Sequence, residues 1–208
     1  MAFVDLIRGP ALALTVGIAL ALAGGRAVAQ QADPDWPCQQ ILVPELSGGQ
    51  MWSGPSLDGL PPAPNEEKFW AVVRKLIDKD VPLETVGGEV DTFLATAPGE
   101  RQQMVGMLFV ASLDEINHAR GKMIEGLKRY GRNQRALAKQ VSAENRALQQ
   151  LQGTGAAADK IAELQAAKDW DTRLFTDRQK TGRNLCDQPV QLEQRAFAIA
   201  RLLQEKQS

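Results

Sequence analysis

The fold is decided by residues 109–151, which read FVASLDEINHARGKMIEGLKRYGRNQRALAKQVSAENRALQQL. No proline interrupts this stretch, so nothing in it forbids a continuous helix. Apolar side chains recur at alternating intervals of three and four residues, which is the heptad spacing of a coiled coil. The two heptad positions hold Leu113, Arg120, Leu127, Gln134, Val141 and Leu148, and Phe109, Ile116, Met123, Tyr130, Leu137, Glu144 and Leu151. The spacing predicts one long helix from about Pro98 to Gln152 with an apolar seam along it.

This helix is predicted to turn back on itself near residues 153–155. The tripeptide Gly153-Thr154-Gly155 ends the heptad pattern, and glycine is the usual residue just beyond a helix C-terminus. A fourth helix is expected from about Ala156. Together the two long helices predict an all-α fold built on a long antiparallel, coiled-coil-like hairpin.

The seam of the fourth helix is harder to follow. Ile161 and Leu164 continue a heptad, whereas Trp170 and Leu174 fit a shifted seam better, so the phase there stays open. Pro189 either breaks this helix or kinks it, because proline removes one main-chain hydrogen bond and its ring crowds the preceding turn.

The chain before the hairpin divides into an arm and two short helices. Proline recurs through residues 30–64, which predicts an ordered, extended arm because the segment also carries apolar and tryptophan side chains. A helical domain follows over residues 65–208. It opens with a short helix capped by Asn65, and a second short helix is expected from Pro82 to about Ala97.

The first 29 residues resemble a secretory signal peptide. An apolar run precedes Ala27-Val28-Ala29, which places small residues at both positions that signal peptidase reads. Cleavage is expected before Gln30, and the expected location is the periplasm. The alternative is an uncleaved membrane anchor, for which the apolar run from Gly9 to Gly25 is marginal in length. The mature chain is expected to have no transmembrane segment.

Cys38 and Cys186 are the only two cysteines, and they lie near opposite ends of the expected mature chain. An even pair in an exported protein predicts a disulfide. A reactive thiol pair is the alternative, but the chain has no CxxC motif and no histidine beside either cysteine.

Composition and motifs argue against several functional classes. The 208 residues are 44% hydrophobic and 24% charged, which is typical of a globular protein, and the net charge of −1 gives no overall attraction for nucleic acid or acidic lipid. The single histidine, His118, falls on the outer face of the long helix. We therefore expect no metal site, no cofactor and no enzymatic activity.

Two groups of residues on the hairpin are candidate sites. A basic stripe on outward heptad positions could dock an acidic protein face or an anionic surface, although most such stripes are solvated helix faces. It comprises Lys122, Lys128, Arg129, Arg132, Arg135 and Lys139. Folding the hairpin about Thr154 also brings together polar residues that could bind a small ligand or could fix the register of the helices. They are Tyr130, Gln134, Asp171 and Arg178.

Three segments resemble uncharacterised exported proteins of proteobacteria. They are DWPC at residues 35–38, WDTRLF at 170–175 and LCDQPVQLEQRAFAIAR at 185–201. The resemblance implies no activity. From the residues we therefore expect a non-enzymatic periplasmic interaction or scaffold protein. The alternative is an accessory protein that binds a small ligand or metal in the polar stretch of the hairpin.

Overall fold

A computed structural model describes residues 33–207, so the predicted signal peptide at 1–29 lies outside the described residues. The described chain contains four α-helices and one short 3-10 turn at Gly48–Gln50, and no strand occurs within it. The helices are α1 (Glu67–Ile77), α2 (Leu83–Thr96), α3 (Arg101–Gly153) and α4 (Ala158–Glu205). The predicted all-α fold, with a long hairpin and two short helices, is confirmed.

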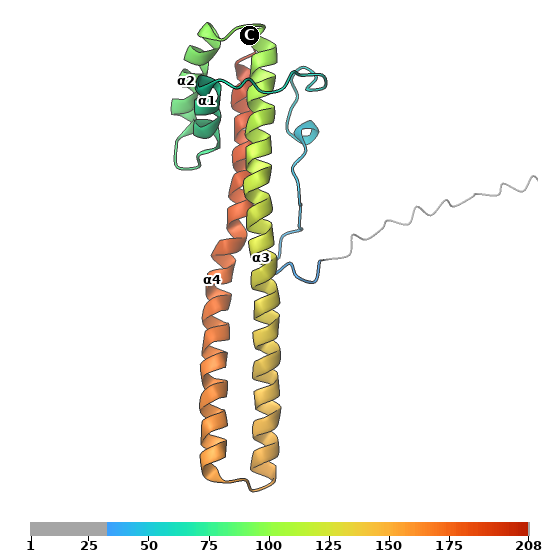
Figure 1. The fold of residues 1–208 in the computed structure, drawn as a ribbon, viewed down its shortest axis with the longest axis vertical. Helices are drawn as coiled ribbons and strands as arrows, with labels where there is room; N and C mark the ends of the chain where they lie inside the picture. Colours follow the sequence, from blue (N-terminus) through green and yellow to red (C-terminus); the bar gives the residue numbers. More distant parts are fainter. Residues whose placement is uncertain (1–32, 208) are drawn as a thin grey trace, which may run out of the picture. The chain divides into compact units, whose positions relative to one another are not determined.

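The long helices α3 and α4 run antiparallel along one another (Figure 1). At their junction Gly155 adopts a left-handed φ of 68°, which glycine reaches without steric cost. The N–H of Thr154 donates to the Gln150 carbonyl, and the N–H of Ala156 donates to the Leu151 carbonyl. These bonds satisfy carbonyls that the helix end leaves open. The turn lies where the glycines predicted it, and α4 begins two residues later than expected.

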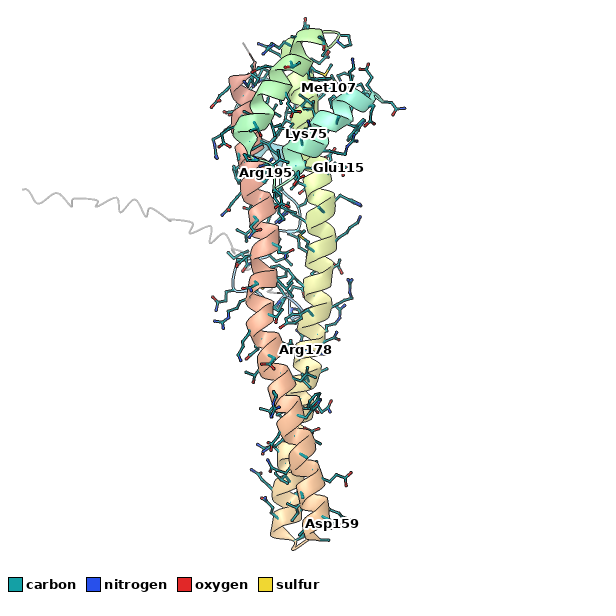
Figure 2. The ribbon with its side chains drawn as sticks, turned by 90° about the vertical axis from the view of Figure 1, so that its left-hand side faces the viewer. Lys75, Met107, Glu115, Asp159, Arg178 and Arg195 are labelled. Atoms are coloured by element: carbon teal, nitrogen blue, oxygen red, sulfur yellow. A yellow bond between two sulfur atoms is a disulfide. The ribbon has the colours of Figure 1, made fainter. Side chains whose placement is uncertain are left out.

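The short helices α1 and α2 cover the end of the hairpin that lies farthest from the turn (Figures 1 and 2). Four apolar side chains of α1 are buried there, at Phe69, Val72, Val73 and Leu76, and Ile77 is partly buried beside them. They pack with the buried faces of α2, α3 and α4 in one core. Burying each such side chain stabilises the fold by about 1.5–3 kcal/mol. The part of the hairpin nearer the turn consists of α3 and α4 alone.

The arm lies along α3 in an extended conformation, as its prolines predicted (Figure 1). Cys38 forms a disulfide with Cys186 of α4, across a Cα–Cα distance of 5.7 Å. Farther along, the Asn117 side chain donates to the Leu46 carbonyl at 3.0 Å and accepts from the Leu46 N–H at 2.9 Å. This paired contact satisfies one residue of extended backbone in the way that a neighbouring β-strand would.

Three local predictions require correction or completion. The residue at the N-cap position of α1 is Glu66 rather than Asn65, because the Trp70 N–H closes the first turn on the Glu66 carbonyl. Trp170 is 65% exposed and does not belong to the seam. Pro189 lies inside α4, which continues through it without a break. No helix among residues 33–207 is long and apolar enough to cross a membrane.

Candidate functional site

Half of the basic stripe is engaged by the arm of the same chain. The Lys128 ammonium lies 3.1 Å from an Asp33 carboxylate oxygen. Arg132 pairs with Asp35 at 2.7 Å, and Arg135 pairs with the same carboxylate while also donating to the Pro34 carbonyl. Within the described chain, the other three stripe residues form no ion pair: they are Lys122, Arg129 and Lys139.

These pairs shift the titration of the groups involved. Hydrogen bonds from Arg132 and then from Arg135 lower the pKa of Asp35. The pKa of Asp33 is lowered chiefly by the N–H of Asp35 and next by Lys128, and the bond to Asp33 raises the pKa of Lys128. The lowered pKa values keep Asp33 and Asp35 ionised at neutral pH, so both aspartates meet the cations as carboxylates. Because the contact is open to solvent, each pair contributes little.

The arm approaches α3 most closely at Gly131. A Cβ built on Gly131 would overlap the Asp35 main-chain carbonyl, so only glycine permits this approach. The arm turns at this point, with the Asp35 N–H donating to the Asp33 carboxylate at 2.8 Å and the Trp36 N–H donating to the Asp33 carbonyl at 3.0 Å. We call residues 33–37 the acidic clasp. A glycine inside a helix indicates either close packing or a hinge, and at Gly131 the structure shows close packing against the arm.

The basic face of α3 continues beyond the clasp. Residues 128, 132, 135, 139 and 146 follow one another at intervals of three, four or seven, which places them on one side of a helix. The clasp covers the first three of these positions. Lys139 and Arg146 are exposed, and neither has an acidic partner among residues 33–207. A cationic surface therefore extends from the clasp toward the hairpin turn.

The predicted polar group does lie across the hairpin, but its contacts go to the backbone. The Tyr130 hydroxyl donates to the Arg178 carbonyl at 2.5 Å, and the Gln134 amide donates to the Phe175 carbonyl at 3.3 Å. Asp171 accepts instead from the Gln140 amide at 2.6 Å. Tyr130 and Arg178 are thus joined, as predicted, but through the Arg178 main chain, and in the described chain no hydrogen bond links the side chains of any two of the four predicted residues. A Cβ on Gly182 would meet the Tyr130 hydroxyl, so a small residue at 182 makes room for the phenol.

A cleft of about 1070 Å³ opens between the arm, α3 and α4 at this level. Gln134 lies in its wall, only 8% exposed, and the Gln134 Oε1 atom has no hydrogen-bond partner in the structure. Tyr130 also lines the cleft. Burial raises the pKa of Tyr130, so its side chain stays a neutral phenol. The remaining wall combines aromatic, amide and cationic side chains from both helices and the arm. They include Trp36, Phe175, Gln179, Lys180 and Arg183.

Most of the cleft could not be anticipated from the sequence. Tyr130 and Gln134 stand out because they interrupt the heptad seam, whereas Trp36 joins the site only because the arm lies against the hairpin in the folded chain. Asp171 and Arg178 were predicted as members of the polar group, but neither lines the cleft. His118 is exposed, and the described residues contain no group of three or more histidine, cysteine, aspartate or glutamate side chains that could hold a metal ion.

Comparisons with protein-family models, curated proteins and solved structures found no match to this chain. Two features of the described chain therefore remain as candidate sites, the basic stripe and the cleft. The basic stripe can bind carboxylates through guanidinium and ammonium groups. The cleft can bind a small molecule that offers a hydrogen-bond donor to Gln134.

Proposed function

We propose that this protein is a periplasmic, non-enzymatic interaction protein that docks an acidic partner protein on the basic stripe of its helical hairpin. The observation that carries the proposal is the acidic clasp. In it, three stripe residues already hold the two carboxylates of a turn in the arm. The sequence pattern of an exported chain and the Cys38–Cys186 disulfide support the compartment, because disulfides persist in oxidising surroundings.

The geometry favours a partner that is acidic and elongated. Cations follow one side of α3 from Lys128 to Arg146, so a partner segment that runs along the helix meets several of them in turn. Single exposed ion pairs contribute about 0–1 kcal/mol, and binding strength must come from their number. Such binding is steered by long-range attraction and weakens as salt is added. An anionic membrane surface would offer the same charge, and it is a separate outcome of the test below.

The test uses the uncovered cations. The variant Lys139→Glu/Arg146→Glu changes the surface that the clasp leaves open, and Lys160→Glu/Arg173→Glu makes the same charge change on exposed positions of α4. A photo-cross-linking residue placed at Ala143 would trap the partner in periplasmic extract, and the affinity of the purified partner would then be measured over a range of salt. Anionic vesicles run in parallel identify a membrane-binding surface.

The α3 reversals are expected to weaken binding at least tenfold, the α4 reversals are expected to leave it unchanged, and wild-type binding should fall as salt rises. A partner affinity that does not change with salt concentration and is kept in both double variants contradicts the proposal. Stable helical content in both variants, measured by circular dichroism, separates a lost surface from a lost fold.

The unpartnered Gln134 Oε1 favours a second candidate, binding of a small ligand in the cleft. A ligand that fills the cleft raises the melting temperature of the protein that binds it. The discriminating variant is Gln134→Leu, because Gln134 lies in the wall of the cleft. Asp171, which the sequence also suggested as a ligand contact, lies outside the cleft lining and is not used. A compound that stabilises the wild type but not Gln134→Leu would establish this function. A shift that is equal in both proteins would place the compound elsewhere.

A further inference from the structure

We infer that the acidic clasp is exchangeable, and that it occupies within the chain the site where an Asp-x-Asp turn of the partner docks. This inference rests on the proposed function and adds to it the chemistry of the recognised segment. It also assigns the clasp a role as an internal competitor for that segment.

The clasp lies outside the covalent anchor of the arm. Residues 33–37 precede Cys38, so they can leave α3 while the disulfide to Cys186 stays intact. Their polar contacts to α3 are the solvent-open pairs at Lys128, Arg132 and Arg135. The indole N–H of Trp36 donates to Gln40, within the arm itself, at 2.8 Å.

The rest of the arm is fastened far more firmly. Beyond the disulfide, the Gln40 side chain donates to the Cys186 carbonyl at 2.6 Å, and the Arg120 guanidinium donates to the Val43 carbonyl at 3.0 Å. Leu46 is buried and makes the paired contact with Asn117. Exchange therefore involves the clasp alone, and the remainder of the arm stays in place.

The contacts of the clasp specify what an incoming segment must offer. Asp33 and Asp35 stand two residues apart, so that Lys128 takes the first carboxylate while Arg132 and Arg135 share the second. The open space at Gly131 admits the main-chain carbonyl of the second acid, Asp35. The site thus accepts a turn that carries two acids separated by one residue. Attachment at Cys38 gives the clasp a local concentration on the order of millimolar, so the free segment must compete with it.

The experiment measures competition directly with a synthetic probe. A fluorescein-labelled peptide Ala-Asp-Pro-Asp-Trp-Pro copies residues 32–37, and a second peptide carries Asn in place of both aspartates. Both are titrated by fluorescence anisotropy against the oxidised protein. The protein variants are wild type, Asp33→Asn/Asp35→Asn, and the matched control Asp58→Asn/Asp80→Asn, which removes two exposed aspartates elsewhere.

The acidic peptide is expected to bind Asp33→Asn/Asp35→Asn at least tenfold more tightly than wild type or the control, because the clasp of that variant no longer competes. The Asn peptide should bind none of them at this strength. Adding Arg132→Glu/Arg135→Glu to the clasp variant should abolish binding of the acidic peptide while leaving the helical content unchanged.

Equal affinity of the acidic peptide for wild type and the clasp variant overturns the inference, and so does absence of binding to both at low salt. Either result leaves the proposed function to be decided by the reversals at Lys139 and Arg146, which lie outside the clasp. Conversely, partner binding that survives the Lys139 and Arg146 reversals, together with normal peptide exchange here, would retain the clasp site and reject docking along the uncovered stripe.

Discussion

The Arg120 guanidinium of α3 donates a hydrogen bond to the main-chain carbonyl of Pro189 in α4, across 3.2 Å. Arg120 occupies a seam position and is only 3% exposed, and it also donates to Val43 of the arm. Burial lowers the pKa of Arg120, while Glu193, 3.8 Å away, opposes that shift. One buried cation therefore joins the arm and both long helices at the level where proline interrupts the α4 hydrogen bonds.

Replacing Arg120 by methionine should destabilise the protein by about 1–3 kcal/mol, because two carbonyls lose their buried donor while side-chain bulk is roughly kept. Urea unfolding measures the change. The control is Arg129→Met, an exposed arginine on the same helix, which should cost no more than about 0.5 kcal/mol. Equal midpoints for the two variants would show that the Arg120 contacts carry no net stability.

Leu127 tests the assignment of the seam. Leu127 is 4% exposed, so Leu127→Asp places an unpaired carboxylate in the hairpin core and should cost about 3 kcal/mol. The adjacent Lys128 is a poor control since it pairs with Asp33. Arg129→Asp, on the exposed face, should change the melting temperature little. If both aspartate variants melted alike, the seam would be wrongly assigned.

Gly131 and Gly121 form a matched pair on α3. Replacing glycine by alanine inside a helix stabilises it by about 1 kcal/mol. Gly121→Ala should show this gain because a Cβ there meets nothing within 4 Å, whereas Gly131→Ala must push back the Asp35 carbonyl. Thermal unfolding should therefore rank Gly121→Ala above Gly131→Ala. A proteolytic cut between residues 33 and 38 should appear faster only in the second variant.

The disulfide should stabilise the folded protein mainly by lowering the conformational entropy of the unfolded chain. Its cysteines lie 148 residues apart, and chain-entropy reasoning for a loop of that length sets an upper value of about 5 kcal/mol. The double variant Cys38→Ala/Cys186→Ala should lower the urea midpoint while the helical signal stays native. An unchanged midpoint would mean that the remaining arm contacts suffice, and reduction of the wild type provides an independent comparison.

The clasp should open in acid but not near neutrality. Asp33 and Asp35 have lowered pKa values in the folded state, so their contribution is complete above the ordinary aspartate pKa of about 3.9. It is lost as pH falls through the lowered folded-state values. The indole resonance of Trp36, followed by NMR from pH 7 to pH 2, should move only below about pH 4. A transition between pH 5 and pH 7 would contradict the assigned ion pairs.

The sequence by itself determined the helical hairpin. The heptad spacing from Phe109 to Leu151 and the glycines around Thr154 are local signals, since helix formation and chain reversal depend on neighbouring residues. Counting from the turn also places Tyr130 near Arg178 and Gln134 near Leu174. The structure confirms the first pair, and Gln134 bonds to Phe175, the residue next to Leu174. The phase of the α4 seam near Trp170 could not be fixed from the sequence, because a two-helix segment buries only a narrow stripe and the exposed Trp170 disturbs the apolar pattern without belonging to the core.

Only the tertiary structure decided what the arm touches. Nothing in the spacing of Asp33 and Asp35 indicates that their partners lie about a hundred residues away on α3. From the sequence alone, the basic stripe is indistinguishable from a row of unpaired cations. Likewise the cleft combines Trp36 of the arm with Gln134 of α3, two residues that become neighbours only when the arm lies against the hairpin. An extended segment has no periodicity that reports its neighbours, because its hydrogen bonds and charges are satisfied by whichever surface the folded chain presents to it.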